Sequence, residues 1–257
     1  GSFIADVNDR RLSFRVSSQG TQTGELLSIR ILDPSKTFSD LSSLGMSSRI
    51  RTRFNANLQR SHGLILIVGT TGAGKSTTAC AALQTIDWNT RNIVSIEDPI
   101  EYQIPNVDQI EVNSRGGQTF QSVLRSVLRL DADVIFIGEI RDEETAKVAC
   151  QAAQTGQLVL ATMHANDSVA AALRLAELAQ DLQAVTTTLR AVLAQTLVRK
   201  LGLACRSAYT PDPQVLSENQ LVAVEGPLYR SPELATAACT HCDNRGFLRR
   251  TGIYELT

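Results

Sequence analysis

The stretch from Leu64 to Ala79 limits what this chain can fold into more than any other part of the sequence. It begins with five consecutive apolar residues, Leu64 to Val68, a pattern that predicts a strand buried on both faces of a sheet. A segment with the spacing Gly-x4-Gly-Lys-Ser follows at residues 69–76, and an apolar-periodic helix is predicted over 76–86. This order of strand, glycine-rich loop and helix predicts a phosphate-binding loop; a plain glycine-rich turn is the alternative.

The chemistry of phosphate binding explains the spacing. Glycines let the backbone curl so that its N–H groups converge on one anion, and the N-terminus of the following helix adds positive potential. Lys75 can reach the β- and γ-phosphates of a nucleotide, and the Ser76 hydroxyl can ligate Mg²⁺. The residues that we assign to nucleotide binding here are Gly69, Thr70, Thr71, Gly72, Ala73, Gly74, Lys75, Ser76 and Thr77. We therefore expect the chain to bind a nucleoside triphosphate.

Composition is that of a globular protein. The 257 residues are 43% hydrophobic and 20% charged, which allows one sizeable core and a small appendage. The formal net charge of −1 gives no general electrostatic reason to expect nucleic acid or an anionic membrane as a partner. No apolar run approaches a membrane span, and the N-terminus carries no secretory signal pattern. Cys80 and Cys150 fall in helical patterns and are expected in the core, which indicates a cytoplasmic location.

The first part of the chain has the pattern of β structure over residues 3–32. About thirty residues cannot form an independent domain, so residues 1–34 are expected to be the remnant of a larger N-terminal domain. A polar, turn-rich linker is expected over 35–48. Arg15 and Arg30 lie among apolar neighbours on two of the predicted strands, and these positions alone favour two solvent-facing arginines.

Acidic residues follow two predicted strands beyond the phosphate loop. Glu97 closes the strand over 93–96, and Glu139 closes the strand over 133–138. Parallel α/β sheets bind ligands beyond the carboxyl ends of their strands. We therefore expect Glu97 or a neighbouring acid to orient or deprotonate the attacking water, and Glu139 to hold Mg²⁺ directly or through its water shell. A polar surface turn is the alternative for the first of these segments.

His164 follows another apolar strand, predicted over 158–162, and so stands on the same rim as the two acids. This position favours a role in γ-phosphate sensing or coupling over a structural histidine.

Helices are predicted between the strands. They lie over 49–60, 119–130, 141–155, 169–178 and 182–201. Arg125 and Arg129 are four residues apart and are expected on one helix face. Alternation of strands and helices over 64–165 predicts an α/β fold, with a RecA-like or doubly wound parallel sheet, and an ATPase core over 49–201.

The last part, residues 202–257, no longer shows the alternation of strands and helices. Prolines and turns lead there to a C-x-x-C motif at 239–242. Such a motif is half of a zinc site. Cys205 is the further thiol, but its expected partner position holds Gly202. His241 lies between the two cysteines of the motif and could not easily join them on one metal. The sequence leaves open whether this small helical and cysteine-containing region binds zinc.

Four motifs together resemble the type II/IV secretion ATPase superfamily, and within it the assembly ATPases of type II secretion and type IV pili. Residues 69–76 look like its Walker A box, 95–101 like its Asp box, 133–142 like its unusual Walker B box, and 155–166 like its His box. Gln157 stands where many members carry a first histidine, so only His164 inherits the role of the His box. The similarity covers nearly the whole chain.

The resemblance implies an ATPase with a RecA-like core that uses ATP and Mg²⁺ and forms a homohexamer with sites near subunit boundaries. It makes Arg15 and Arg30 candidate phosphate-sensing arginines. This replaces the interpretation, based on their positions alone, that they simply face the solvent. The implied catalytic residues are then Glu97, Glu139, Lys75, His164, Arg15 and Arg30. Basic positions that match the family, with a role in nucleotide binding, are Arg125, Arg129 and Arg141.

The thiols Cys205, Cys239 and Cys242 look like the family's tetracysteine module, with Gly202 in place of its first cysteine. Pilus-retraction relatives lack that module, so the resemblance implies a motor that powers assembly of a type IV pilus or a type II secretion pseudopilus. Its implied partners are an inner-membrane platform protein and a cytoplasmic adaptor, at the cytoplasmic face of the membrane. The family's C-terminal domain continues past Thr257, so we expect the sequence to be truncated at both ends.

Other functions remain as alternatives. A pilus-retraction ATPase shares the same core. A nucleic-acid translocase is disfavoured by the near-neutral charge and by the absence of a basic, aromatic-studded groove in the sequence. A non-catalytic nucleotide-dependent scaffold is disfavoured by the presence of Lys75, Ser76, Glu97 and Glu139, and a small-molecule kinase by the lack of a visible lid.

Overall fold

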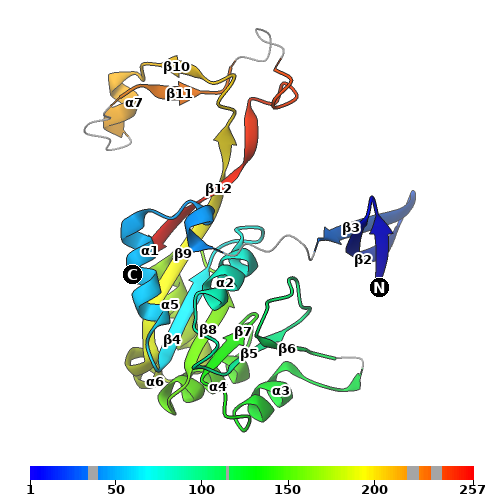
Figure 1. Ribbon diagram of the computed structural model, residues 1–257, viewed down its shortest axis with the longest axis vertical. Coiled ribbons are helices and arrows are strands. Elements are labelled where there is room, and N and C mark those ends of the chain that lie inside the picture. The colour runs from blue at the N-terminus through cyan, green and yellow to red at the C-terminus, as the bar shows by residue number, and fades with distance from the viewer. Residues whose placement is uncertain (34–39, 114–115, 219–225, 233–238) are drawn as a thin grey trace. The chain divides into compact units, whose positions relative to one another are not determined.

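The computed structural model describes residues 1–33, 40–113, 116–218, 226–232 and 239–257 (Figure 1). These residues divide into two compact units. Unit 1 comprises Gly1–Thr196 and Ile253–Thr257, and unit 2 comprises Leu197–Gly252. No helix within the described residues is both long and apolar enough to cross a membrane.

A largely parallel sheet forms the centre of unit 1. Its order in the described residues is β12-β9-β4-β8-β7-β5-β6 (Figure 1). The strands are β4 (Gly63–Val68), β5 (Ile93–Glu97), β6 (Asp108–Glu111), β7 (Val134–Ile137), β8 (Leu158–Met163), β9 (Leu189–Leu201) and β12 (Phe247–Leu256). Pairing is parallel from β9 through β4, β8, β7 and β5 to β6. The predicted α/β fold with a parallel sheet is confirmed.

Helices cover both faces of this sheet because its central strand is apolar on both. All six residues of β4 are buried. Leu64, Leu66 and Val68 pack in one hydrophobic cluster with residues of α3, α4, α5 and α6, whereas Ile65 and Ile67 pack in another with η1, α1 and α2. The helices are η1 (Leu41–Leu44), α1 (Ser48–Leu58), α2 (Lys75–Gln84), α3 (Phe120–Val127), α4 (Glu143–Gln154), α5 (Ser168–Ala179) and α6 (Leu182–Thr188). The period-2 alternation of β4 therefore builds a three-layer core.

The helix predicted over 182–201 is wrong in its second half. The chain is helical only to Thr188, and Leu189–Leu201 form strand β9, which pairs in parallel with β4. The run Ala191 to Ala194 is short and uniformly apolar, so its local pattern fits a buried strand as well as a buried helix. The free edge of β4 decides the matter, because it offers hydrogen-bond partners that a helix would leave unpaired.

Two further segments differ from expectation. The part of the predicted linker that the structure describes contains η1, in which Leu41 is 1% exposed, and Met46 behind it is 6% exposed. These side chains belong to the core because they cover one face of the sheet with α1 and α2. Residues 34–39 of that linker lie outside the described residues. Within 101–118, for which no helix or strand is predicted above, β6 pairs in parallel with β5.

The β structure predicted over 3–32 is present, as an antiparallel three-stranded sheet. Its strands are β1 (Ser2–Val7), β2 (Arg10–Thr21) and β3 (Gly24–Leu32). Exposed apolar side chains remain on it, among them Phe3, Leu26 and Ile31. That this sheet is the remnant of a larger N-terminal domain stays a prediction.

Unit 2 has little regular structure of its own. Its described elements are β10 (Ser207–Tyr209), β11 (Leu228–Arg230) and α7 (Pro213–Glu218), besides the parts of β9 and β12 that fall within Leu197–Gly252. Cation–π contacts support it: Arg199 lies 4.0 Å from the ring centre of Phe247, and Arg206 lies 3.8 Å from that of Tyr229. The final residues, Ile253–Thr257, belong to unit 1 rather than to the region predicted over 202–257.

Candidate functional site

The phosphate loop lies between β4 and α2, where the sequence predicts it. Gly74 is the N-cap of α2 and has φ +89°, a left-handed conformation that favours glycine. The structure gives this cap no side-chain hydrogen bond, in contrast to the side-chain caps of α3, α4 and α5 at Thr119, Asp142 and Asp167. The first N–H groups of α2 are therefore available to an anion, as the sequence predicts for residues 69–77.

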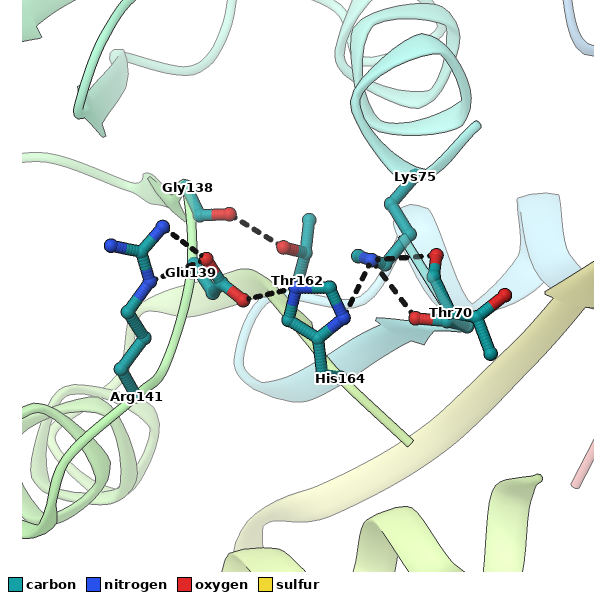
Figure 2. Close-up of polar contacts among 8 residues, drawn as sticks. Thr70, Lys75, Gly138, Glu139, Arg141, Thr162 and His164 are labelled. Carbon is teal, nitrogen blue, oxygen red and sulfur yellow. Dashed lines mark hydrogen bonds and ion pairs between the residues drawn. The ribbon is translucent and has the colours of Figure 1, made fainter. Parts of the chain in front are cut away.

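Lys75, the first residue of α2, extends its side chain over the loop (Figure 2). Its Nζ donates to the carbonyl oxygen of Gly69 at 2.9 Å and to that of Thr70 at 3.2 Å. Partial burial lowers the pKa of Lys75, and the nearby carboxylates of Glu139 and Glu101 oppose that shift. A half-buried ammonium with backbone carbonyls as partners is suited to exchange them for phosphate oxygens.

His164 connects this lysine to the acid at the end of the neighbouring strand (Figure 2). Its Nδ1 lies 3.4 Å from Lys75 Nζ, and its Nε2 lies 2.9 Å from Glu139 Oε1. An ammonium can only donate, so Nδ1 is the acceptor and Nε2 carries the hydrogen that faces Glu139. The three side chains come from α2 and from the segments after β7 and β8, which confirms that these strand ends form one rim.

Glu139 is held from its other side by Arg141. The Nε and Nη2 atoms of Arg141 each lie 2.5 Å from Glu139 Oε2 (Figure 2). Thr162 Oγ1 donates to the carbonyl oxygen of Gly138 at 2.5 Å and ties the ends of β7 and β8 together. Both carboxylate oxygens of Glu139 thus have partners, so this residue fits a cation better through a water shell than by direct ligation.

Glu97 is a buried carboxyl at the end of β5, with 8% of its surface exposed. Its Oε1 accepts hydrogen bonds from Ser95 Oγ at 2.8 Å and from Gln109 Nε2 at 3.0 Å. Burial raises the pKa of Glu97, and the two hydrogen bonds oppose that shift. A carboxylate of raised pKa is a stronger base, which suits proton abstraction from water.

Because Gly138 has no side chain, β5 and β7 can lie close together beside Glu97. A Cβ at position 138 would lie 3.1 Å from the carbonyl oxygen of Ile96 and 3.3 Å from the Cα of Glu97. Any side chain at this position would therefore crowd the Glu97 backbone. Gln109 is a member of the site that the sequence did not reveal, because the strand that presents it, β6, was not predicted.

The predicted arginines have different partners. Arg141 contacts Glu139 on this rim, whereas Arg125 pairs with Glu144, in the first turn of α4. Arg129 lies in the turn after Val127, where α3 ends, so the two arginines do not belong to one helix as expected. Arg15 and Arg30 belong to the N-terminal sheet, where they occupy directly opposite positions on β2 and β3 and are exposed. Like charges placed opposite each other destabilise a sheet unless an anion lies between them. Their role in phosphate sensing remains a proposal.

A second cluster lies in unit 2. The Sγ atoms of Cys205, Cys239 and Cys242 all lie within 4.8 Å of one another. Hydrogen bonding to Cys242 raises the pKa of Cys205 to about 11, whereas the backbone N–H of His241 lowers the pKa of Cys239. The cluster as described does not include the His241 side chain.

Gly202 occupies the fourth corner of this cluster. A Cβ there would lie 3.0 Å from Cys205 Sγ and 3.7 Å from Cys242 Cβ. Three convergent thiols are the donor set that Zn²⁺ prefers, and a tetrahedral site needs one ligand more. The residues present therefore fit a zinc ion with one open position.

Comparisons with known proteins agree with this geometry. The family model described as "Type II/IV secretion system protein" matches residues 1–257. The chain is 40% identical over 256 residues to "Type II secretion system protein E" of Pectobacterium carotovorum subsp. carotovorum, and 41% identical over 257 residues to "Type II secretion system ATPase E" of Vibrio cholerae. Each alignment covers 100% of this chain and 50% of the relative, so the chain spans about half the length of these curated relatives.

Solved structures share the fold. The pilus retraction motor PilT with bound ADP is 29% identical, with a TM-score of 0.64, over 79% of this chain and 60% of its own. The Legionella pneumophila ATPase DotB is 22% identical, with a TM-score of 0.63, over 77% of this chain and 58% of its own, and supports the fold alone. These neighbours confirm the predicted RecA-like core.

Proposed function

The chain belongs to the type II/IV secretion system protein family, and from this membership we propose that it hydrolyses ATP to ADP and phosphate. The observation that carries the proposal is the connected rim of Lys75, His164 and Glu139 beside the phosphate loop, with the buried base Glu97 on the neighbouring strand. A lysine that binds phosphate and a residue that orients or deprotonates the water recur at sites where water attacks a γ-phosphate, and Lys75 and Glu97 fit these two roles.

Each residue then has a defined task. Lys75 and the N–H groups of residues 69–77 bind the β- and γ-phosphates. Glu97 orients the attacking water and accepts its proton. His164 responds to the γ-phosphate through Lys75 and passes the change to Glu139, because one imidazole contacts both. Magnesium, held by Ser76 and by Glu139 through water, would supply charge neutralisation of the phosphates.

The names of the similar proteins described above support a proposal for the biological role. The relatives at about 40% identity are type II secretion proteins E, whereas the pilus retraction motor is 29% identical. The cysteine cluster of unit 2 also supports secretion or pilus assembly over retraction. We therefore assign the chain to a motor of type II secretion or type IV pilus assembly, working with an inner-membrane platform protein and an adaptor at the cytoplasmic face.

Such a motor is proposed to be a homohexamer in which Arg15 and Arg30 stabilise the transition-state charge from a neighbouring subunit. The exposed pair of like charges on β2 and β3 supports this, since an anion between them would remove their repulsion.

The test is the steady-state ATPase rate against protein concentration, with light scattering on the same samples. Specific activity that rises as hexamers appear is the expected result. A monomer that hydrolyses ATP at the full rate would overturn the shared site and the two arginine assignments. No hydrolysis at any concentration, with hexamers present, would overturn the ATPase proposal for this chain.

A further inference from the structure

Gln195 is a buried amide that contacts the phosphate loop from the neighbouring strand. It lies on β9, which pairs with β4, and its side chain is 6% exposed. Its Nε2 donates to the carbonyl oxygen of Ala73 at 2.7 Å. Its Oε1 is also buried and has no hydrogen-bond partner in the described structure. Burying an amide with one polar atom unpaired costs free energy of folding. We therefore ask what the buried amide gains for the protein through its bond to Ala73.

The side of the loop that Gln195 contacts is the buried one. Gly69 and Ala73 are buried, whereas Thr70, Thr71 and Gly72, between them, are exposed. The backbone carbonyl of Gln195 also lies so close to Gly69 that any side chain there would collide with it. Gln195 therefore supports the loop from behind with both its backbone and its side chain.

The bond to Ala73 fixes the orientation of one peptide group. In a planar trans peptide the carbonyl of Ala73 and the N–H of Gly74 point in opposite directions. Since Gln195 holds the carbonyl on the buried side, the Gly74 N–H is turned toward the open side of the loop. A phosphate bound there would meet a donor instead of a carbonyl oxygen.

This peptide needs an anchor because Gly74 gives it freedom. Gly74 has φ +89°, and a glycine populates positive and negative φ about equally. The Ala73–Gly74 peptide can therefore rotate with little steric resistance. After such a rotation, the Ala73 carbonyl would face the anion and repel it.

We propose that Gln195 is a positioning residue for nucleotide binding, which holds the Ala73–Gly74 peptide so that the Gly74 N–H faces the bound phosphate. The proposal rests on the proposed nucleotide-binding function. Its effect is on affinity for ADP and ATP and on KM, with kcat little changed, because Gln195 does not contact the residues assigned to the chemistry.

The first variant is Gln195→Met, which keeps the length of the side chain and removes its donor. Titration with a fluorescent ADP is expected to give about tenfold weaker binding, the usual cost of leaving one buried acceptor without a partner. Asn55→Leu is the matched control: Asn55 Oδ1 is likewise buried and unpaired, but lies on α1, and this variant is expected to bind ADP like the parent chain.

A second variant, Gln195→Glu, separates positioning from general packing. An ionised carboxylate cannot donate to Ala73, but a protonated one can, and burial favours the protonated form. Binding of ADP, relative to the parent chain at each pH, is expected to be weak at pH 8 and to recover as the pH falls toward 5.5. Gln195→Met is expected to show no such recovery.

If the parent chain binds ADP, two results would overturn this inference alone. The first is a folded Gln195→Met variant that binds ADP as tightly as the parent. The second is a Gln195→Glu variant whose ADP affinity does not recover at low pH. If Gln195→Met does not fold, as judged by circular dichroism, the pH series of Gln195→Glu decides. A parent chain that does not bind ADP would overturn the nucleotide-binding proposal and this inference together.

Discussion

Two sets of side chains converge in this molecule: the rim beside the phosphate loop in unit 1, and the cysteine cluster in unit 2. Different parts of the structure hold them in place. Lys75, His164, Glu139 and Arg141 stand at the ends of elements built on a buried sheet, and each contacts another member of the set. In the described residues of unit 2, Cys242 is the one buried apolar side chain. The rim is held in place by a core, whereas the cluster lies in a unit that has almost none.

The difference suggests what each site needs. A small unit with little buried apolar surface depends on a metal or another cross-link for its stability. The cluster offers three thiols and Gly202 at the fourth corner, so such a cross-link would be incomplete in this chain. We infer that the rim keeps its geometry without ligands and that the cluster gains its own from whatever it binds.

The largest effect is expected at Glu97. Glu97→Gln should retain ATP binding and lose about 1,000-fold in turnover, because the amide cannot accept the proton of water while it keeps the hydrogen bonds from Ser95 and Gln109. Steady-state ATPase assays and nucleotide titration check both parts. Glu177→Gln, an exposed change on α5, is the control that should leave both unchanged. Normal turnover in Glu97→Gln would remove this residue from the mechanism.

Lys75→Ala should weaken ATP binding by about 100-fold, since it removes charged hydrogen bonds to phosphate, and turnover should fall with it. The fold should persist, because the core below the loop supplies its own packing. Binding can be measured by calorimetry and folding by circular dichroism. Lys147→Ala, which breaks only an exposed pair with Glu143 on α4, is the matched control. Unchanged ATP affinity in Lys75→Ala would contradict the assignment of the loop.

Gly202→Cys should give the cysteine cluster a fourth thiol, so that bound zinc holds the cluster in place as the core holds the rim. Position 202 does not have a positive φ, and the one close contact of a new Cβ, 3.0 Å to Cys205 Sγ, involves a side chain that can shift. A fourth thiolate should raise zinc affinity by about tenfold or more, since even an outer-shell partner changes metal affinity by that factor.

Competition for zinc with a chromophoric chelator measures that gain, and proteolysis of unit 2 with and without zinc measures its consequence. Zinc should protect the variant more than the parent chain. Ser217→Cys adds an exposed thiol on α7, outside the cluster, and should change neither result. Equal zinc affinity in the Gly202→Cys variant and the parent would show that Gly202 is not the missing corner.

The smallest effect concerns stability and pH. Burial raises the pKa of Glu97 in the folded chain, so the folded state favours its protonated form. The stability from that form is present at acidic pH and is lost as the pH rises through the raised pKa. Glu97→Gln cannot ionise, so its melting temperature should exceed that of the parent by a few degrees at pH 8, and the difference should shrink toward pH 4. A lower melting temperature of the variant at pH 8 would show that ionised Glu97 stabilises the fold.

The sequence by itself determined the nucleotide rim. The phosphate loop is contiguous from Gly69 to Ser76, so its spacing can be read directly. Glu97, Glu139 and His164 could be placed together because parallel strands present their carboxyl ends at one edge of a sheet. The cysteine cluster was likewise predictable as a set of thiols with one position missing.

Only the tertiary structure decided which partners these residues have. The segment Leu189–Leu201 became a strand because β4 had a free edge beside it, and β6 formed because β5 had one. Those two pairings bring Gln195 to the back of the phosphate loop and Gln109 to Glu97. Leu41 and Met46 joined the core because they cover apolar surface supplied by distant segments. Such choices depend on contacts between residues far apart in the chain, and the local pattern of the sequence does not contain them.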